Sequence, residues 1–336
     1  MIGLDIGNRF IKICQVENLS GDFSIVASAM APNPAWQVQE NQADLISRAV
    51  KSLVKEHYFS TKVAALSLDG PQVLIRNLSL PPLPKEELKD AVELEAEQVI
   101  FQDLALMDRD FQVLSNGAEE KLEILYVAAP KELVDQRVSV IQQAGLEPVV
   151  MDVDSIALAD LFLTLEQKSQ PLTGSFIILN LGHTQTNMSI VGGGLLRFAK
   201  SVSFGAETVI DSIMKSMEIP FASAEEIMKE PKLWEQWGLN IKNILRKSTP
   251  NLIEALYRSI EYCRSTQKVL EIEKILLTGG LSALQGFDEF IAEIIGLKTE
   301  RWNPFLSLKG NYRQDLVPYM SVALALALRQ SPKRRT

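Results

Sequence analysis

The sequence has little of what zinc coordination, export or nucleic-acid binding usually requires. Its 336 residues include two cysteines and two histidines, and Cys14 and Cys263 are too far apart for the short spacings of zinc sites. The longest apolar runs, such as 322–328, are far shorter than the roughly 20 residues that span a bilayer. With 34 basic and 42 acidic side chains the net charge is -8, which repels nucleic-acid phosphates. We therefore expect reduced thiols, no nucleic-acid partner and no direct insertion into a membrane.

The two ends of the sequence carry no strong targeting signal. The opening MIGLDIG has no basic region followed by an apolar stretch, so we expect a cytoplasmic protein. The basic residues Lys333, Arg334 and Arg335 would each add about 1 kcal/mol near an anionic lipid surface, which is too little to anchor the chain. Any association with the inner membrane is expected to be peripheral and to depend on protein partners.

The length and composition predict two folded domains of mixed α/β structure. A chain of 336 residues with 46% apolar and 23% charged residues exceeds the size of one usual hydrophobic core. In the first part, runs rich in Ile, Val and Phe predict strands, and apolar residues at 3.6 spacing predict a helix. The predicted elements are strands 2–6, 10–16, 23–29, 62–67 and 72–78 and a helix within 41–57.

The middle of the chain reads as a small α+β unit with its own core. It follows the proline-rich stretch from Leu80 to Pro84, which marks a boundary. Its elements are an acidic amphipathic helix at 85–100, strands 111–114, 122–128 and 147–151, and a helix at 131–144.

The opening pattern returns in the second half. After a helix at about 154–167, the strand pair 176–181 and 186–191 repeats the order strand, polar residue, apolar residue, glycine, turn and returning strand. A third strand with glycines lies at 274–280, and an apolar helix at 318–328 closes the fold. We expect two related sheet domains that face one another.

Three glycine turns are the candidate binding elements. DIG at 5–7, NLG at 180–182 and LLTGG at 276–280 each place glycine at the end of a buried strand. Glycine has no Cβ, so its backbone N–H group can approach an anion closely, and two opposed turns can hold a polyphosphate from both sides. A single such turn is more often a plain hairpin, but the order and separation of the three predict a nucleotide between the domains.

Longer segments around these turns resemble the PilM family of type IV pilus assembly proteins, which is related to FtsA. The resemblance covers essentially the whole chain and includes GLDIGNRFIK, ILNLGHTQTNMSIVGGG, ILLTGGLSALQGF, LPPLPKEELKDAVELEAEQVI and VSFGAETVIDSI. It implies an actin-like (ribonuclease H-like) two-domain ATPase fold with an FtsA-type inserted α+β subdomain. The implied first domain is 1–79, completed by 152–172 and 318–336. The inserted subdomain would be 80–151, and the second domain 173–317, with a smaller part at about 206–270.

The resemblance also assigns roles to residues of the three turns. ATP or ADP would bind with Mg²⁺, and Asp5 would hold the hydrated metal. Phosphates would contact the backbone of the turns and the ammonium of Lys12, and the adenosine would lie over the third turn. The implied nucleotide-binding residues are Gly7, Asn8, Arg9, Lys12, Gly182, His183, Thr184, Gly279, Gly280 and Leu281, and weaker matches add Gly205, Glu207, Glu226 and Lys229.

Asn180 departs from the superfamily pattern, in which an aspartate usually stands at this place. An amide cannot accept a proton and offers one oxygen, so metal affinity and water activation should both fall. We expect ATP hydrolysis to be slow or absent. An alternative is that Asn180 still orders water through hydrogen bonds.

The resemblance implies a part in the inner-membrane platform of a type IV pilus. The expected partner is the N-terminal peptide of PilN, and through it PilO. The peptide would lie in a groove formed by the stretch around Leu74 to Leu83 and the helix from Lys85. Self-association stays open. The rival hypotheses are a small-molecule kinase of the sugar-kinase type, an FtsA-like division protein, and a scaffold of type II secretion.

Overall fold

The computed structural model describes residues 1–19, 22–114, 121–166, 174–266 and 271–329. The predicted basic tail Lys333, Arg334 and Arg335, and parts of the predicted segments 152–172 and 318–336, lie outside these residues. No helix in the described ranges is both long and apolar enough to cross a bilayer.

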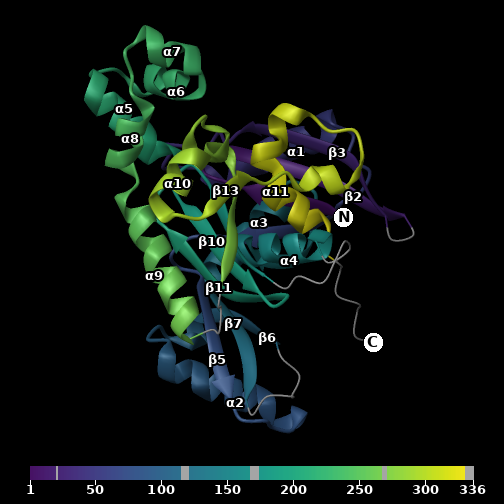
Figure 1. The fold of residues 1–336 in the computed structure, drawn as a ribbon. Helices are drawn as coiled ribbons and strands as arrows, with labels where there is room; N and C mark the ends of the chain where they lie inside the picture. Colours follow the sequence, from purple (N-terminus) through teal and green to yellow (C-terminus); the bar gives the residue numbers. More distant parts are fainter. Residues whose placement is uncertain (20–21, 115–120, 167–173, 267–270, 330–336) are drawn as a thin grey trace.

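The first sheet has the strand order β14-β3-β2-β1-β4-β8 (Figure 1). Strands β1, β2 and β3 form an antiparallel meander, and β4, β8 and β14 add to it in parallel. The meander was predicted, because its strands are apolar and adjacent in the sequence. The bounds are β1 (Ile2–Ile6), β2 (Phe10–Leu19), β3 (Asp22–Pro32), β4 (Val63–Leu68), β8 (Glu147–Val153) and β14 (Lys309–Gly310).

The second sheet repeats this design, with the order β11-β10-β9-β12-β13. Strands β9 and β10 form the predicted hairpin, and β12 pairs with β9 in parallel, as β4 does with β1. Strand β11 follows β10 through Gly193 and Gly194, which both have positive φ, and it was not predicted. The bounds are β9 (Ser175–Leu181), β10 (Thr186–Gly192), β11 (Leu195–Val202), β12 (Ile272–Thr278) and β13 (Lys298–Arg301).

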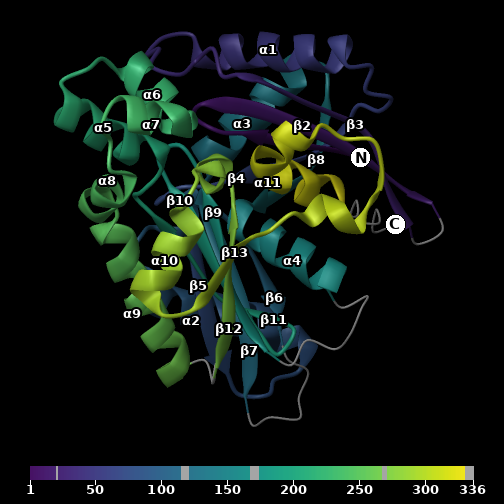
Figure 2. The same ribbon diagram turned by 45° about the horizontal axis from the view of Figure 1, so that its top comes forward.

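Helices α4 (Asp154–Glu166) and α11 (Val317–Ala327) lie between the two sheets. Both are apolar nearly all round, which fits helices buried on every side. Helix α11 packs so closely on β1 that a Cβ on Gly3 would lie 1.9 Å from the Ala323 carbonyl oxygen. Only glycine fits at this contact. The predicted apolar terminal helix is therefore part of the core, and it joins the sheets into one two-domain body (Figure 2).

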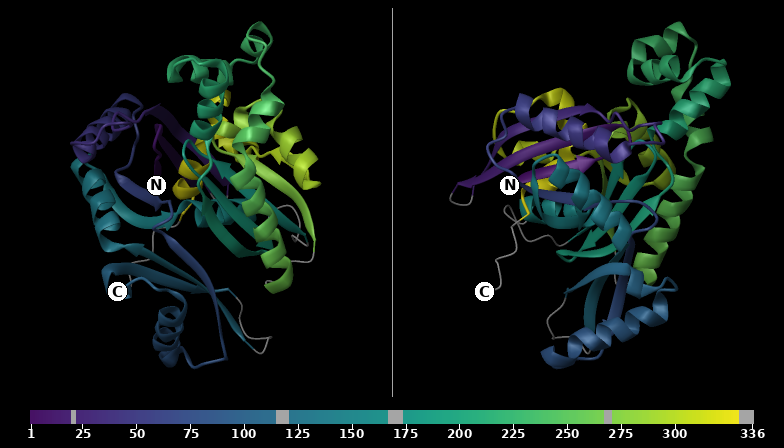
Figure 3. Two further views of the ribbon diagram at one scale, coloured as in Figure 1. Left: turned by 90° about the vertical axis from the view of Figure 1, so that its left-hand side faces the viewer. Right: turned by 180° about the vertical axis from the view of Figure 1, so that it is seen from behind.

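Further helices cover the outer faces of the sheets. The first sheet is covered by α1 (Gln42–Glu56) and α3 (Lys131–Gln143). The second is covered by α5 (Ala206–Met217), α9 (Pro250–Thr266) and α10 (Phe287–Ile295). Three short helices extend this side into the arm seen in Figure 3: α6 (Phe221–Lys229), α7 (Pro231–Gln236) and α8 (Ile241–Ser248). The 3-10 turns are η1 (Leu104–Leu106), η2 (Gly280–Ala283), η3 (Pro304–Ser307) and η4 (Gln314–Leu316).

A small third sheet forms the inserted unit at the bottom of Figure 1. Its order is β5-β7-β6, with β5 (Leu74–Leu80), β6 (Met107–Val113) and β7 (Leu122–Pro130), and α2 (Lys85–Val99) packs on it. The unit thus begins with β5, before the predicted boundary at residue 80. Helix α3 and strand β8, predicted within the unit, belong to the first domain, because β8 pairs with β4 and α3 packs against α1.

Candidate functional site

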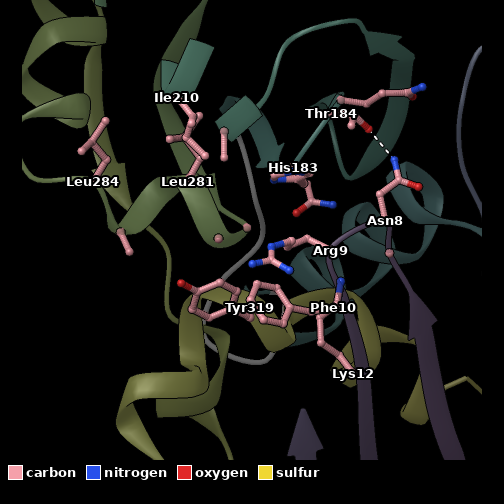
Figure 4. Close-up of a pocket in the computed structure, with 18 of the residues that line it drawn as sticks. Asn8, Arg9, Phe10, Lys12, His183, Thr184, Ile210, Leu281, Leu284 and Tyr319 are labelled. Carbon is pink, nitrogen blue, oxygen red and sulfur yellow. Dashed lines mark hydrogen bonds between the residues drawn. The ribbon is translucent and has the colours of Figure 1, made fainter. Parts of the chain in front are cut away.

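Both hairpin turns open into one cavity of about 310 Å³ between the domains. Figure 4 shows Asn8, Arg9, His183 and Thr184 converging on it from opposite sides. The sequence-predicted residues that line it are Asp5, Gly7, Asn8, Arg9, Lys12, Asn180, Gly182, His183, Thr184, Lys229, Gly279, Gly280 and Leu281. The structure therefore brings together the three turns that the sequence places far apart.

The first turn joins β1 to β2 and carries charge. The Gly7 N–H donates to the Phe10 carbonyl oxygen at 3.0 Å and closes the hairpin. Asp5 and Lys12 lie opposite one another in the register, and the Lys12 ammonium is 2.5 Å from Asp5 Oδ2. A Cβ on Gly7 would be 2.9 Å from Lys12 Nζ. Glycine therefore leaves room for this ammonium beside the turn.

The second turn joins β9 to β10 with the same backbone design. The Gly182 N–H donates to the Gln185 carbonyl oxygen at 2.9 Å, and a Cβ on Gly182 would lie 2.7 Å from that oxygen. The start of α5 supports the turn from behind, because the Glu207 N–H donates to the His183 carbonyl oxygen at 2.9 Å. A Cβ on Gly205 would be 2.3 Å from the same carbonyl. Gly205 and Glu207 thus hold the turn and do not line the cavity.

The third turn follows β12 and passes close under the second. Gly279 has φ +86°, and a Cβ there would lie 2.5 Å from the Leu181 carbonyl oxygen. Both the conformation and the space therefore require glycine. Gly280 lies against the Tyr319 ring of α11, at 2.6 Å from a built Cβ. This contact joins the third turn to the helix between the sheets.

Two contacts cross the cleft at its mouth. The Asn8 amide donates to the Thr184 hydroxyl, which joins the first turn to the second. The Arg9 guanidinium donates to Glu225 on α6, with Nη2 at 3.0 Å from Oε2. Both contacts link domains that would have to admit a ligand between them.

Acidic groups and neutral amides face each other across the floor of the cavity. The first domain supplies Asp5, Asp69 and Asp154, and the second supplies Asn180, Gln185 and Asn187. Burial, with added repulsion from Asp69 and Asp5, raises the pKa of Asp154 well above its usual range. The Asn187 amide donates to Asp154 Oδ2 at 3.3 Å. The floor can therefore attract cations from one side and donate hydrogen bonds from the other.

Four lining residues with ionisable side chains were missed by the sequence reasoning: Asp69, Asp154, Glu225 and Tyr319. Asp69 precedes Gly70 at the end of β4, in a strand, aspartate and glycine pattern like that of the first turn, so a signal was present. Glu226 was predicted, but the structure brings Glu225 to the cavity. The two residues are about 100° apart on a helix, and Glu226 faces solvent.

The residues present fit a polyphosphate and a hydrated metal. Lys12, Arg9 and Lys229 supply positive charge at the cavity, and residues of both glycine turns line it. Within the described ranges, no three Asp, Glu, His or Cys side chains are grouped closely enough to hold a metal ion. Mg²⁺ binds mainly through waters and phosphate with one or two carboxylates, so Asp5 suffices in this setting.

The repeated sheets, the paired helices between them and the shared cavity define a protein of the actin-like ATPase fold. The structure is similar to that of a PilM-PilN type IV pilus biogenesis complex, with a TM-score of 0.84, 24% identity and 97% of each chain covered. It is also similar to the ethanolamine utilization protein EutJ of Carboxydothermus hydrogenoformans, with a TM-score of 0.57, 15% identity, and 97% of this chain and 88% of that one covered.

Sequence comparison gives the family. The model of the type IV pilus assembly protein PilM family matches residues 3–331, and the chain belongs to this family. A curated relative is the cell division protein FtsA of Enterococcus faecalis. It is 21% identical over an alignment 351 residues long, gaps included, which covers 90% of this chain and 78% of that protein. The predicted PilM-like and FtsA-like character of the sequence is confirmed.

Proposed function

We propose that this protein is a nucleotide-binding component of the inner-membrane platform of a type IV pilus. ATP or ADP would bind with Mg²⁺ between the two glycine turns. The observation that supports this most is the single cavity that both turns share. Asp5 would hold the metal, Lys12 would face the phosphates, and the third turn, from Gly279 to Leu281, would lie beneath the adenosine. The metal would supply charge neutralisation of the phosphates.

Slow or absent hydrolysis is part of the proposal. Asn180 stands two residues before Gly182, as Asp5 stands two residues before Gly7. Its side chain lines the cavity but cannot take a proton from a water molecule. ATP would then stay bound for a long time without being hydrolysed and would act as a switch. The ATPase activity would be weak.

The second part of the proposal is a peptide partner. A related structure is described as a PilM-PilN complex, and we propose that this chain holds the N-terminal peptide of PilN, and through it PilO. The groove would involve β5, the turn after it and the start of α2. An extended peptide with alternating apolar side chains suits such a groove. Peripheral attachment to the inner membrane would follow from this partner.

Contacts between the inserted unit and the second domain support a coupling of the two sites. Arg197 on β11 bonds Glu123 on β7, with Nη1 at 2.6 Å from Oε2. The Asn77 amide on β5 donates to the Arg197 carbonyl oxygen at 2.9 Å. Strand β10 runs from the second glycine turn to Gly192, whose carbonyl accepts from Arg197 Nε at 3.0 Å. A movement of the second turn would thus be passed along β10 to β5.

Titration calorimetry tests the proposal. We expect a non-hydrolysable ATP analogue with Mg²⁺ to change the affinity for the PilN peptide at least about fivefold, and the peptide to change nucleotide affinity by the same factor. Arg197→Ala should reduce this factor while each ligand still binds, and Arg48→Ala, which removes an exposed helical ion pair, should leave it unchanged. Equal peptide affinity with and without saturating nucleotide would refute the proposed coupling. Absence of nucleotide binding would refute the proposed nucleotide switch.

A further inference from the structure

The side chain of Arg9 makes a contact that the phosphate role of its backbone does not explain. It leaves the first turn and crosses the cleft to Glu225 on α6, with Nη2 at 3.0 Å from Oε2 and Nε at 3.4 Å from Oε1. This paired geometry is the one that a guanidinium offers to a carboxylate or to a phosphate. Glu225 therefore fills a place that a phosphate group could fill equally well.

The ring of Trp36 holds the guanidinium in this place. The Arg9 Cζ atom lies 4.0 Å from the centroid of the Trp36 ring. Trp36 in turn contacts Phe221 of α6 and His183 of the second turn, with ring centroids 5.3 and 5.7 Å apart. Stacking on an aromatic face orients a guanidinium while its donor edge stays available. Arg9 is therefore fixed at the cavity, where Figure 4 shows it beside His183.

The charges around this place favour a second anion. Arg9 and Lys229 both bond Glu225, so two cations meet one carboxylate. Although burial opposes it, the hydrogen bonds from Arg9 and Lys229 lower the pKa of Glu225. Burial and the charge of Arg9 lower the pKa of His183, which therefore stays neutral at pH 7. Its Nε2 atom is buried and has no hydrogen-bond partner among the residues that the structure describes.

We propose that the side chains of Arg9 and His183 form an anion subsite for the polyphosphate of the ligand, and that Glu225 is an internal anion that fills this subsite when the ligand is absent. The identity of the anion as part of a nucleotide rests on the proposed function. When the phosphate displaces it, Glu225 keeps its ion pair with Lys229, four residues along α6, at 2.9 Å. The exchange therefore leaves no charged group without a partner. It also breaks the contact between Arg9 of the first turn and Glu225 of α6.

The test measures the binding of tripolyphosphate, which has neither base nor ribose. Arg9→Gln should weaken it about tenfold, because a charge-assisted paired contact is lost. Arg9→Lys, which keeps the charge without the fork, should lose less. Glu225→Gln should strengthen binding about threefold, because the competing anion is gone. Arg48→Gln serves as a matched control, because it removes an exposed ion pair with Asp44 within helix α1. This variant should bind tripolyphosphate with the affinity of the wild type.

The double variant decides between competition and general charge. If Glu225 competes for Arg9, then Glu225→Gln should have no effect in the Arg9→Gln background. An equal gain in both backgrounds would overturn the subsite, and so would an unchanged affinity of Arg9→Gln or a wild type that does not bind tripolyphosphate. Calorimetry with the ATP analogue separates the two proposals. If tripolyphosphate follows the predicted pattern and the analogue does not bind, the subsite stands and the nucleotide function falls.

Discussion

The two hairpin turns share a backbone and differ in chemistry. Two residues before the glycine and five after it, the strands pair Asp5 with Lys12 in the first hairpin and Asn180 with Asn187 in the second. The first pair is an acid and a base in contact, and the second consists of neutral amides. Both domains thus have the same turn, but only the first hairpin carries an acid and a base at these paired positions.

This difference divides the work between the domains. The first domain can hold the metal and neutralise phosphate through groups of opposite charge. The second can donate hydrogen bonds without adding repulsion to the carboxylates of Asp5, Asp69 and Asp154. The second hairpin contributes neutral amides and no carboxylate that could activate water, which suits a binding switch better than an efficient hydrolase.

The largest effect is expected for Asp5→Ala. Loss of the metal carboxylate should weaken the binding of ATP in the presence of Mg²⁺ about 100-fold, or by about 2.7 kcal/mol. With a chelator present the variant should bind at least as well as the wild type, because a negative charge is gone and Lys12 is free for phosphate. Calorimetry under both conditions measures this, and an equal loss with the chelator would show that Asp5 acts through the fold and not through the metal.

Alanine at the two turn glycines should separate stability from binding. Gly182→Ala places a Cβ against the backbone oxygen of Gln185 and should cost about 2 kcal/mol of unfolding free energy. Gly7→Ala meets the movable end of Lys12 first, and should cost less than about 1 kcal/mol while weakening nucleotide binding. Urea unfolding without ligand gives both values. Equal destabilisation of the two variants would contradict the difference in packing.

Asn180→Asp should restore a group that can order and activate water. We expect the steady-state rate of ATP hydrolysis to rise about tenfold, equivalent to about 1.4 kcal/mol, over a slow wild type. Asn180→Ala is the control and should give no increase. Efficient turnover by the wild type, lost in Asp5→Ala, would refute the view that Asn180 suppresses hydrolysis.

The smallest effect concerns the buried carboxyl of Asp154. Its pKa is raised in the folded state by burial and by the nearby Asp69 and Asp5, so the folded protein holds this proton more tightly than the unfolded chain. Stability is therefore lost as pH rises from the ordinary value of 3.8 through the raised pKa. Asp154→Asn should raise the Tm by a few degrees at pH 8 and by less at pH 4.5. A gain that does not grow with pH would exclude this titration as its cause.

Local sequence patterns made the hairpins predictable, whereas the remaining sheet topology depends on strands that are far apart in the sequence. Strands β1, β2, β9 and β10 are each apolar, close in sequence and separated by a glycine turn, so period and turn chemistry were enough. The pairing of β5 with β7 and of β8 with β4 joins segments many residues apart, and no local signal fixes it. The division of residues 80–151 between two sheets could not be predicted for this reason.

The same limit applies to the site. Asp5, Gly7 and Gly182 were predicted because their turns carry the motif themselves. Asp154 begins a helix and Tyr319 lies within one, so only the packing of α4 and α11 between the sheets brings them to the cavity. Glu225 was missed by one position, since the sequence does not show which face of a short helix meets the cleft. The assignment of all these residues to nucleotide remains a prediction.

The most direct measurement is the rate of disulfide formation between Asn8→Cys and Thr184→Cys, which replaces the contact that joins the two turns. Cys14 and Cys263 will not interfere, because burial raises the pKa of each thiol to about 12. If a polyphosphate lies between the turns, the ATP analogue with Mg²⁺, at a concentration that calorimetry shows to saturate this variant, will slow the reaction strongly. An unchanged or faster rate under saturation would mean that the ligand binds elsewhere, and would contradict the shared site.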